Sequence, residues 1–475
     1  MTIVSLKHLG MMGAVACLLT LRPTLAASVA PSVIMPTPWA MSVGKADYSL
    51  NAHGSVLDIE GAHVELTSSK DRKSVFGGSI SSVDATHYRG HIVGLSGLIS
   101  TAAASDGSGI WIRADSTLGK LTFANSQASL VKGTSSSQKR EIQIVVPNSA
   151  TVLVFGTFLE GDGHSQVDHL SLMLGDAVPH DSIVPAHTEL DAAIKIIRGN
   201  ALHASLIDWN VEPSKLHAQI GKDDWSQDTY SLIRELLTSL QDHHSRLLSP
   251  TEADATRSAT AAISAPNVEQ RSGGVGYIAL PGFNNSERHN VDAYEESALT
   301  GISRIAVDVR TGWIIDLRND TGGNVWPMLV ALGPFLGDGP LGYFKGSFGI
   351  SEPWKVHAEN GHLKAPVDFS TVPLAVLIGP RTVSAGEAVV IALHGRPHTR
   401  FFGTPTAGVP TGNRIFTLPD GAEIALTTSV ELDRFQKEYD GPLQPDVVVA
   451  RQLPSTANTD NELAAAQKWL LNAAR

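Results

Sequence analysis

The sequence predicts a multidomain protein with an N-terminal all-β sandwich, a helical segment and a C-terminal α/β core. Three observations support this prediction. Short apolar segments separated by Gly, Ser, Asp and Asn fill residues 31–176, and helical periodicity dominates residues 180–250. From residue 273 to residue 475, apolar strands alternate with amphipathic helices. A chain of 475 residues has room for these domains and for at least one sizeable core.

The composition is that of a globular protein and excludes several functions. Hydrophobic residues make up 42% of the chain and charged residues only 17%. The formal net charge of −11 argues against a nucleic-acid-binding surface. Cys17, the single cysteine, lies in an N-terminal segment that we expect to be removed. The mature chain would then have no disulfide or cysteine-based zinc site, and we expect no cofactor and no metal.

Residues 1–26 are typical of a secretory signal peptide. Lys7 precedes an apolar run from Leu9 to Leu21, which is too short to span a membrane comfortably. Small residues follow from Ala26 to Ala30, where a signal peptidase could cut. We therefore expect export to the periplasm or the extracellular space, with no integral membrane segment after cleavage.

The three predicted domains are separated by changes in pattern. Residues 31–176 contain segments such as GIWIRADS and TVLVFGTFLEG and resemble the jelly-roll domains related to carbohydrate-binding modules. The sequence of this region has no cluster of aromatic residues that would indicate a sugar-binding surface, so glycan binding is the less favoured expectation. Residues 180–250 form the predicted helical domain, and the polar residues 251–272 a linker. Residues 273–475 form the predicted α/β core with a largely parallel sheet.

One serine stands between a strand and a helix in the stretch IGPRTVSAGEAVVIALHG. The apolar strand ends near Pro380, and a helix opens at Ala385. A hydroxyl at Ser384 lies beside unpaired helix N–H groups that carry partial positive charge. Ser384 is either a helix cap or a nucleophile held at the turn, and this segment alone leaves both interpretations open.

A second segment, GWIIDLRNDTGGNVWP, turns sharply after a buried strand. Gly322 and Gly323 can direct main-chain N–H groups outward, as an oxyanion hole requires. A glycine-rich turn without a ligand is the alternative. Asp316 and Arg318 are expected to form an ion pair that braces the turn, and Trp326 to lie in the core nearby.

A third segment, LTSLQDHHSRLLSP, ends a helix in a histidine pair. His243 and His244 are adjacent, so they point to different faces of a helix and make a poor pair of metal ligands. One of them acting as a general base is chemically more economical.

Together these segments resemble the tail-specific, or C-terminal-processing, serine proteases, including the tricorn and retinoid-binding-protein-like branches. DLRNDTGG is similar to the family loop Asp-Leu-Arg-x-Asn-x-Gly-Gly, TVSAGEAVV to its nucleophile turn, and LQDHHS to its Asp-Gly-His-Ser segment. GTPTAG and GPLQPDVVV match two further landmarks. The resemblance covers residues 186–449 and implies a ClpP/crotonase-like protease core.

The resemblance implies roles for individual residues. Ser384 would attack a peptide carbonyl, and His244 would remove its proton and later protonate the leaving amine. The N–H groups of Ala385 and of Gly322 or Gly323 would hold the oxyanion. The expected substrate is therefore a peptide or protein.

The chain departs from the family pattern at several positions. Val409 occupies the position of the lysine that one branch uses, and a valine cannot accept a proton, so the Ser–His arrangement remains. His243 replaces the usual glycine before His244. The acid that orients the histidine has its nearest equivalent in Asp440, with Glu438 as the alternate. The linker is also too short for the family's PDZ module.

The sequence thus predicts an exported serine-type peptidase of the Ser–His branch. A non-catalytic peptide- or glycan-binding protein on a degenerate protease scaffold is the alternative. An esterase is a third interpretation, but the chain lacks the Gly-x-Ser-x-Gly turn of the common hydrolase fold.

Overall fold

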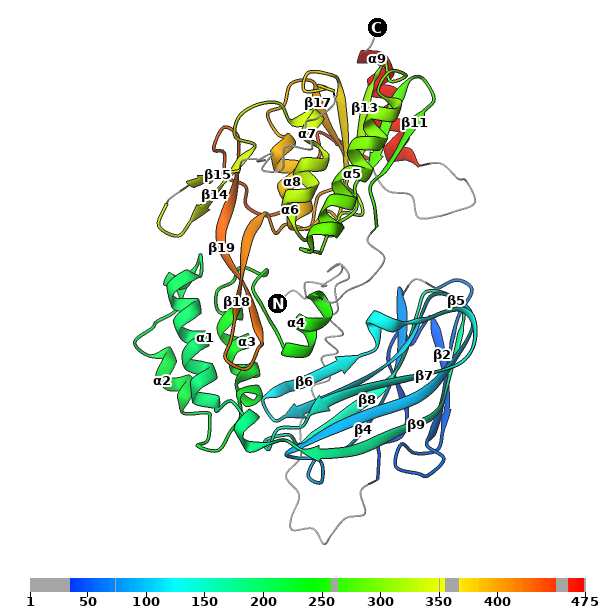
Figure 1. Ribbon diagram of the computed structural model, residues 1–475, viewed down its shortest axis with the longest axis vertical. Helices are drawn as coiled ribbons and strands as arrows, with labels where there is room; N and C mark the ends of the chain where they lie inside the picture. Colours follow the sequence, from blue (N-terminus) through cyan, green and yellow to red (C-terminus); the bar gives the residue numbers. More distant parts are fainter. Residues whose placement is uncertain are drawn as a thin grey trace, which may run out of the picture.

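Figure 1 shows a computed structural model of the chain. It describes residues 35–72, 74–257, 264–349, 351–354, 367–449 and 460–473. The predicted signal peptide, residues 1–26, lies outside these described residues. Among the helices within them, none is both long and apolar enough to cross a membrane.

The N-terminal domain is an antiparallel sheet of nine strands. They are β1 Ala40–Val43, β2 Tyr48–His53, β3 Ala62–Ser68, β4 Phe76–Asp84, β5 His91–Ser116, β6 Gly119–Asn125, β7 Val131–Val145, β8 Val152–Glu160 and β9 His164–Ala177. The order is β1-β4-β8-β5-β9-β3-β2, and β6 and β7 both pair with β5 (Figure 1). The strand-rich character predicted for this region is confirmed, and the jelly-roll description stays a prediction.

The long strand β5 shows why this part of the chain folds as a sheet. Val93, Leu95 and Ile99 lie at alternating positions and are fully buried, as expected for one face of a strand. They belong to a core to which most of the nine strands contribute. The strands of this sheet therefore share a hydrophobic interior of their own, and none of them contains a residue of the predicted catalytic set.

The helical region is confirmed, but it does not have a core of its own. It contains α1 Ala186–Asn200, α2 Glu212–His217 and α3 Tyr230–Thr238. These helices pack on a five-stranded sheet of β10 Arg246–Leu248, β14 Gly342–Gly346, β15 Ser351–Pro353, β18 Thr411–Thr417 and β19 Glu423–Asp433.

The hairpin β18–β19 joins the helical region to the C-terminal part of the chain. Leu190 and Ile233 from the helices share a buried cluster with Ile424 and Leu426 from β19. Strand β10, which follows the histidine pair, is hydrogen-bonded to β19 in antiparallel register. Arg246 and Ala425, which are 179 residues apart in the sequence (425 − 246), therefore lie side by side. Figure 1 shows the hairpin β18–β19 next to helices α1 and α3.

The predicted linker, residues 251–272, contains regular structure at both ends. Helix α4 spans Pro250–Arg257, and strand β11 spans Asn267–Arg271. Lys120 Nζ of the N-terminal domain donates a hydrogen bond to Glu252 Oε1 of α4 over 3.0 Å. This end of the segment is therefore attached to the N-terminal sheet.

The C-terminal core is built on a six-stranded sheet in the order β11-β12-β13-β16-β17-β20. The further strands are β12 Val275–Ala279, β13 Gly312–Asp316, β16 Leu374–Ile378, β17 Thr399–Gly403 and β20 Val447–Val448. All neighbouring pairs are parallel except β11 and β12, which confirms the largely parallel sheet.

Helices cover both faces of this sheet. On one face lie α5 Arg288–Ile305, α6 Val325–Ala331, α7 Gly333–Leu336 and α8 Ala385–Leu393, and on the other α9 Asn461–Ala473. Strand β16 is buried along its whole length because it is central and covered on both faces. Its carboxyl end leads directly into the turn that carries Ser384.

Two expectations about the glycine-rich loop have opposite outcomes. The ion pair between Arg318 and Asp316 is confirmed at 2.6 Å, and Arg318 also contacts Glu462 of α9 at 2.5 Å. The prediction that Trp326 is in the core is wrong. Its side chain is 43% exposed, because it lies in the first turn of α6 with only an edge contact to Phe344.

We predict that Ile424→Ala, in β19, destabilises the protein by about 2–5 kcal/mol, because the side chain is fully buried and its removal leaves a cavity. The matched control, Ile415→Ala on the paired strand β18, removes a side chain that is 56% exposed and should change stability by less than about 0.5 kcal/mol. Urea unfolding measures both values. Equal effects would contradict the shared core.

Candidate active site

Ser384 sits in a strained turn between β16 and α8. Its backbone has φ 53° and ψ −115°, a conformation that residues other than glycine rarely adopt. An ordinary N-cap serine has extended backbone angles and accepts a helix N–H with its hydroxyl. Ser384 and Glu387 are arranged as a capping box, in which the Glu387 side chain accepts the N–H of Ser384. The N–H groups of Glu387 and Ala388 donate hydrogen bonds to the main-chain oxygen of Ser384. The strained backbone, and not the capping arrangement, is what distinguishes Ser384 from an ordinary N-cap serine.

The main-chain N–H groups around Ser384 resemble an oxyanion hole. A Cβ atom added to Gly322 would lie 3.1 Å from Ser384 Cβ and 3.2 Å from Ala385 N, so the glycine loop touches the serine turn. Within the described chain, neither Ala385 N–H nor Gly323 N–H donates a hydrogen bond. The N–H of Gly322 is already used, because it donates to Asp320 Oδ1 over 2.9 Å. Of the two glycines that the sequence left open, Gly323 has the free donor.

Glu387 holds the serine turn against the loop before β18. This fully buried carboxylate accepts hydrogen bonds from Ser384 N at 3.0 Å, Gly408 N at 2.8 Å and Val409 N at 2.9 Å. It also accepts one from Thr406 Oγ1 at 2.5 Å. Burial raises the pKa of Glu387, and these hydrogen bonds oppose that shift. The position where one branch of the family has lysine thus contributes its main-chain N–H to a carboxylate.

His244 is partly buried and is fixed by the same loop. Its Nδ1 atom is 2.7 Å from Thr411 Oγ1, the first residue of β18. Its main-chain N–H donates to Asp242 Oδ1 over 2.9 Å. Burial lowers the pKa of His244 to about 4, and the nearby charge of Arg246 adds to this shift. The imidazole is therefore neutral at neutral pH, as a general base must be.

The neighbouring His243 has a different environment. It is exposed and its φ is 56°, which is the left-handed region that glycine adopts most easily. The motif that this segment resembles has glycine at this position. His243 therefore adopts the backbone conformation that the glycine would have, and its side chain points to no separate function. Of the two imidazoles, His244 is the one that the structure fixes by a side-chain hydrogen bond.

Among the interactions of the described residues, neither predicted acid forms a hydrogen bond or an ion pair with His244. Asp440 is exposed, and Glu438 forms an ion pair with Lys345 at 3.0 Å. Nδ1 of His244 instead has a neutral partner, the Thr411 hydroxyl. Sequence reasoning missed Thr411 because its proximity to His244 depends on the β18–β19 hairpin folding back onto β10.

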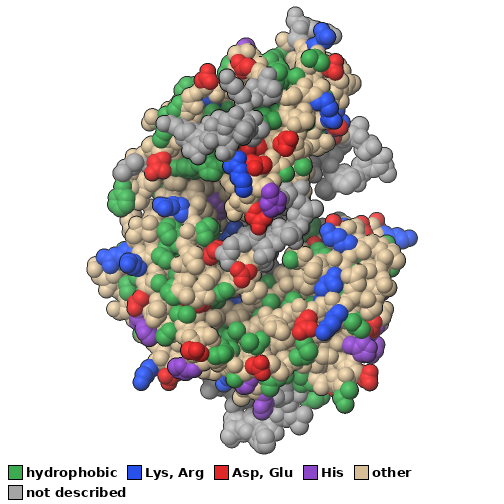
Figure 2. All heavy atoms as spheres, in the orientation of Figure 1, with side chains coloured by type: hydrophobic (Ala, Val, Ile, Leu, Met, Phe, Trp, Pro, Cys, Tyr) green, Lys and Arg blue, Asp and Glu red, His purple; other side chains and the backbone are tan. Residues whose placement is uncertain are grey.

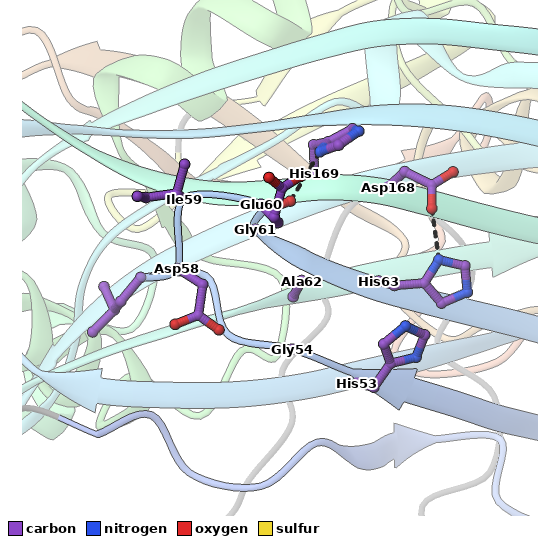
Figure 3. Close-up of a pocket in the computed structure, with 11 residues that line it drawn as sticks. His53, Gly54, Asp58, Ile59, Glu60, Gly61, Ala62, His63, Asp168 and His169 are labelled. Carbon is purple, nitrogen blue, oxygen red and sulfur yellow. Dashed lines mark hydrogen bonds and ion pairs between the residues drawn. The ribbon is translucent and has the colours of Figure 1, made fainter.

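A separate open pocket lies in the N-terminal domain, between the β2–β3 connection and β9 (Figure 3). The rings of His53 and His63 stack there with centroids 4.6 Å apart. His63 Nδ1 is 2.6 Å from Asp168 Oδ1. Although burial opposes it, hydrogen bonds to Asp168 and Glu65 raise the pKa of His63. The lining residues include no Trp, Tyr or Phe, so this pocket lacks the flat ring on which a sugar usually stacks.

The surface charges are dispersed. On the face shown in Figure 2, the described Lys and Arg side chains are spread among acidic ones and do not gather into one basic surface. The described residues also contain no group of three or more His, Cys, Asp and Glu side chains that could hold a metal ion.

The C-terminal core matches a known family. Residues 274–449 match the family model described as peptidase family S41. The nisin-resistance protein of Lactococcus lactis subsp. lactis is 30% identical over 169 residues, which are 34% of this chain and 49% of that protein. The carboxyl-terminal-processing protease of Synechocystis sp. is 29% identical over 184 residues, which are 38% of this chain and 40% of that protein.

A solved structure shares the fold. The structure of a lipoprotein from Streptococcus agalactiae aligns with a TM-score of 0.53 and 23% identity, over 63% of this chain and 99% of that one. The chain spans about half or less of the length of the curated relatives named above. By this match and these similarities, the part of the chain that spans residues 274–449 is of the peptidase family S41 type and similar to carboxyl-terminal-processing proteases.

Proposed function

We propose that this protein is an exported serine peptidase that hydrolyses peptide bonds by a Ser–His mechanism. The observation that carries the proposal is the strained turn at Ser384, which lies against the glycine loop and next to the N–H of Ala385, a donor without a hydrogen bond in the described chain. A non-glycine residue at positive φ costs about 1–3 kcal/mol and persists mainly where function requires it. A capping serine would have no need of this strain.

The reaction would proceed through an acyl-enzyme. The Ser384 oxygen attacks the peptide carbonyl carbon while its proton passes to Nε2 of His244. The N–H groups of Ala385 and Gly323 donate hydrogen bonds to the oxyanion that forms. His244 then gives the proton to the leaving amine, and a water molecule hydrolyses the resulting ester by the same steps.

Thr411 would set the tautomer of the base. For Nε2 to accept a proton, the ring hydrogen must be on Nδ1, and Nδ1–H can donate to Thr411 Oγ1 over 2.7 Å. The hydroxyl thereby orients the ring without a charge. In this proposal the Thr411 hydroxyl takes the orienting role that the sequence analysis expected of the Asp440 carboxylate.

The surface beside the glycine loop supports a peptide substrate. Trp326 is 43% exposed and follows the loop by three residues, and its ring meets Phe344 edge to face with centroids 6.5 Å apart. We propose that Trp326 contacts apolar side chains of the substrate. The α4-containing segment has no room for an inserted peptide-binding module, so substrate selection would depend on this surface.

We predict that a fluorophosphonate probe labels the wild-type protein and that both Ser384→Ala and Ser384→Gly abolish labelling. The two variants should differ in stability: Ser384→Gly should be about 1 kcal/mol more stable than Ser384→Ala, because only glycine adopts the positive φ without strain. Intact-mass spectrometry and urea unfolding measure the two effects. Absence of wild-type labelling would instead support the non-catalytic peptide-binding alternative.

His244→Ala should slow labelling by about 10²–10⁴-fold, because the general base is lost. His243→Ala serves as the matched control and should leave the rate close to that of the wild type. The wild-type rate should fall as the pH drops through about 4, where His244 becomes protonated and can no longer accept the serine proton. A large effect of His243→Ala with none from His244→Ala would reassign the base.

Thr411→Val should slow labelling by about 10–100-fold, because the isosteric side chain cannot hold the imidazole ring. Thr411→Ser keeps the hydroxyl and should retain most of the activity. Comparing the labelling rates of the two variants at one pH separates the effect of losing the hydrogen bond from the effect of changing the packing. If Thr411→Ser were as slow as Thr411→Val, the hydroxyl would have no orienting role.

A further inference from the structure

Asp320 is buried between the glycine loop and the helix that follows Ser384. Its side chain is 0% exposed. Oδ1 accepts the N–H of Gly322 over 2.9 Å, whereas Oδ2 has no hydrogen-bond partner among the described residues. The main-chain oxygen of Asp320 accepts Val383 N–H over 3.0 Å, and a Cβ added to Gly386 would lie 2.9 Å from Asp320 Cγ. The carboxyl group therefore touches both walls of the proposed oxyanion hole.

The charged and titratable groups around Asp320 are directed elsewhere. Tyr294 of α5 donates its hydroxyl to Pro281 O over 2.7 Å. Glu387 of α8 faces Thr406 and the loop before β18, as described above. Arg318, two residues before Asp320, is occupied by Asp316, Asp460 and Glu462.

An ionised carboxylate in this position would have one hydrogen bond and no counter-ion among these groups. Such a group is strongly disfavoured in a site without water. Burial accordingly raises the pKa of Asp320 to about 7. A neutral carboxylic acid fits the same site better, because it leaves a hydroxyl unpaired rather than a charge.

We propose that Asp320 is a positioning residue that holds the oxyanion loop as a neutral acid, and that the loop functions only while this carboxyl is protonated. The proposal rests on the function proposed above for Ser384. The neutral carboxyl accepts Gly322 N–H through Oδ1 and so leaves Gly323 N–H free for the substrate oxyanion. In the motif that this loop resembles, asparagine stands at this position, and its amide is the neutral isostere of a protonated aspartate.

Ionisation of Asp320 would oppose catalysis for two reasons. A negative charge beneath the loop repels the negative charge that develops on the substrate oxygen. The buried carboxylate also favours rearrangements of the loop that admit water. The activity would then be highest between about pH 4 and pH 7. Protonation of His244 would set the lower limit of this range, and ionisation of Asp320 the upper limit.

The first experiment measures the labelling rate by the fluorophosphonate probe from pH 5 to pH 9. The wild-type rate should fall about tenfold per pH unit above about pH 7, whereas Asp320→Asn should show no such fall. The control Asp338→Asn, at an exposed position, should follow the wild type. A wild-type rate that stays flat to pH 9, or an Asp320→Asn rate that still falls, would overturn the proposal. The wild-type profile decides the matter even if Asp320→Asn does not fold.

The second experiment needs no catalysis and therefore separates failure of this inference from failure of the proposed function. Between about pH 4 and pH 7 the folded protein keeps a proton on Asp320 that the unfolded chain releases, so folding stability falls as the pH rises. Asp320→Asn lacks this proton. The urea midpoint of Asp320→Asn relative to the wild type should rise from pH 4 to pH 7 and then level off. A constant difference would overturn the protonated state of Asp320.

Discussion

The site depends on one buried carboxylate, that of Glu387. Its two oxygens accept hydrogen bonds from the serine turn on one side and from residues 406–409 on the other. Burying a carboxylate is costly unless its lone pairs are satisfied, and here four donors satisfy them. Because residues 406–409 lead directly into β18, the same carboxylate sets where the strand begins. Thr411, and with it the ring of His244, is thereby placed relative to Ser384.

The β18–β19 hairpin carries this placement from the α/β core into the helical region. Its buried face packs on α1 and α3, and its edge pairs with β10 directly after the histidine segment. The proposed base, His244, and the proposed nucleophile, Ser384, thus come from different parts of the chain, and the hairpin connects these parts. Stability of the helical region and geometry of the site are therefore coupled, because both depend on the burial of residues such as Ile424.

The elements around the site could be predicted from the sequence because their signals are local. The apolar run of β16, the helix after Ser384 and the double glycine each depend on neighbouring residues, and the motifs give their order. The partners could not be predicted in the same way. Thr411 reaches His244 through strand pairing over 167 residues, and the exposure of Asp440 and Trp326 depends on how distant segments pack. The positive φ of His243 accounts for the glycine that the resembled motif has at this position, and the structure gives no reason for the histidine.

The side chains of the buried acids near Ser384 differ in how many hydrogen bonds they accept. Glu387 and Asp320 are both fully buried, yet Glu387 receives four hydrogen bonds and Asp320 receives one from a main-chain N–H. Glu431 is buried as well, and its Oε2 has no partner in the described chain. Burial, reinforced by the like charge of Glu387, raises its pKa well above the ordinary value. Of these three acids, Asp320 lies directly beneath the glycine loop. A negative charge on its carboxyl group would therefore be the one that most strongly repels the oxyanion of the proposed reaction.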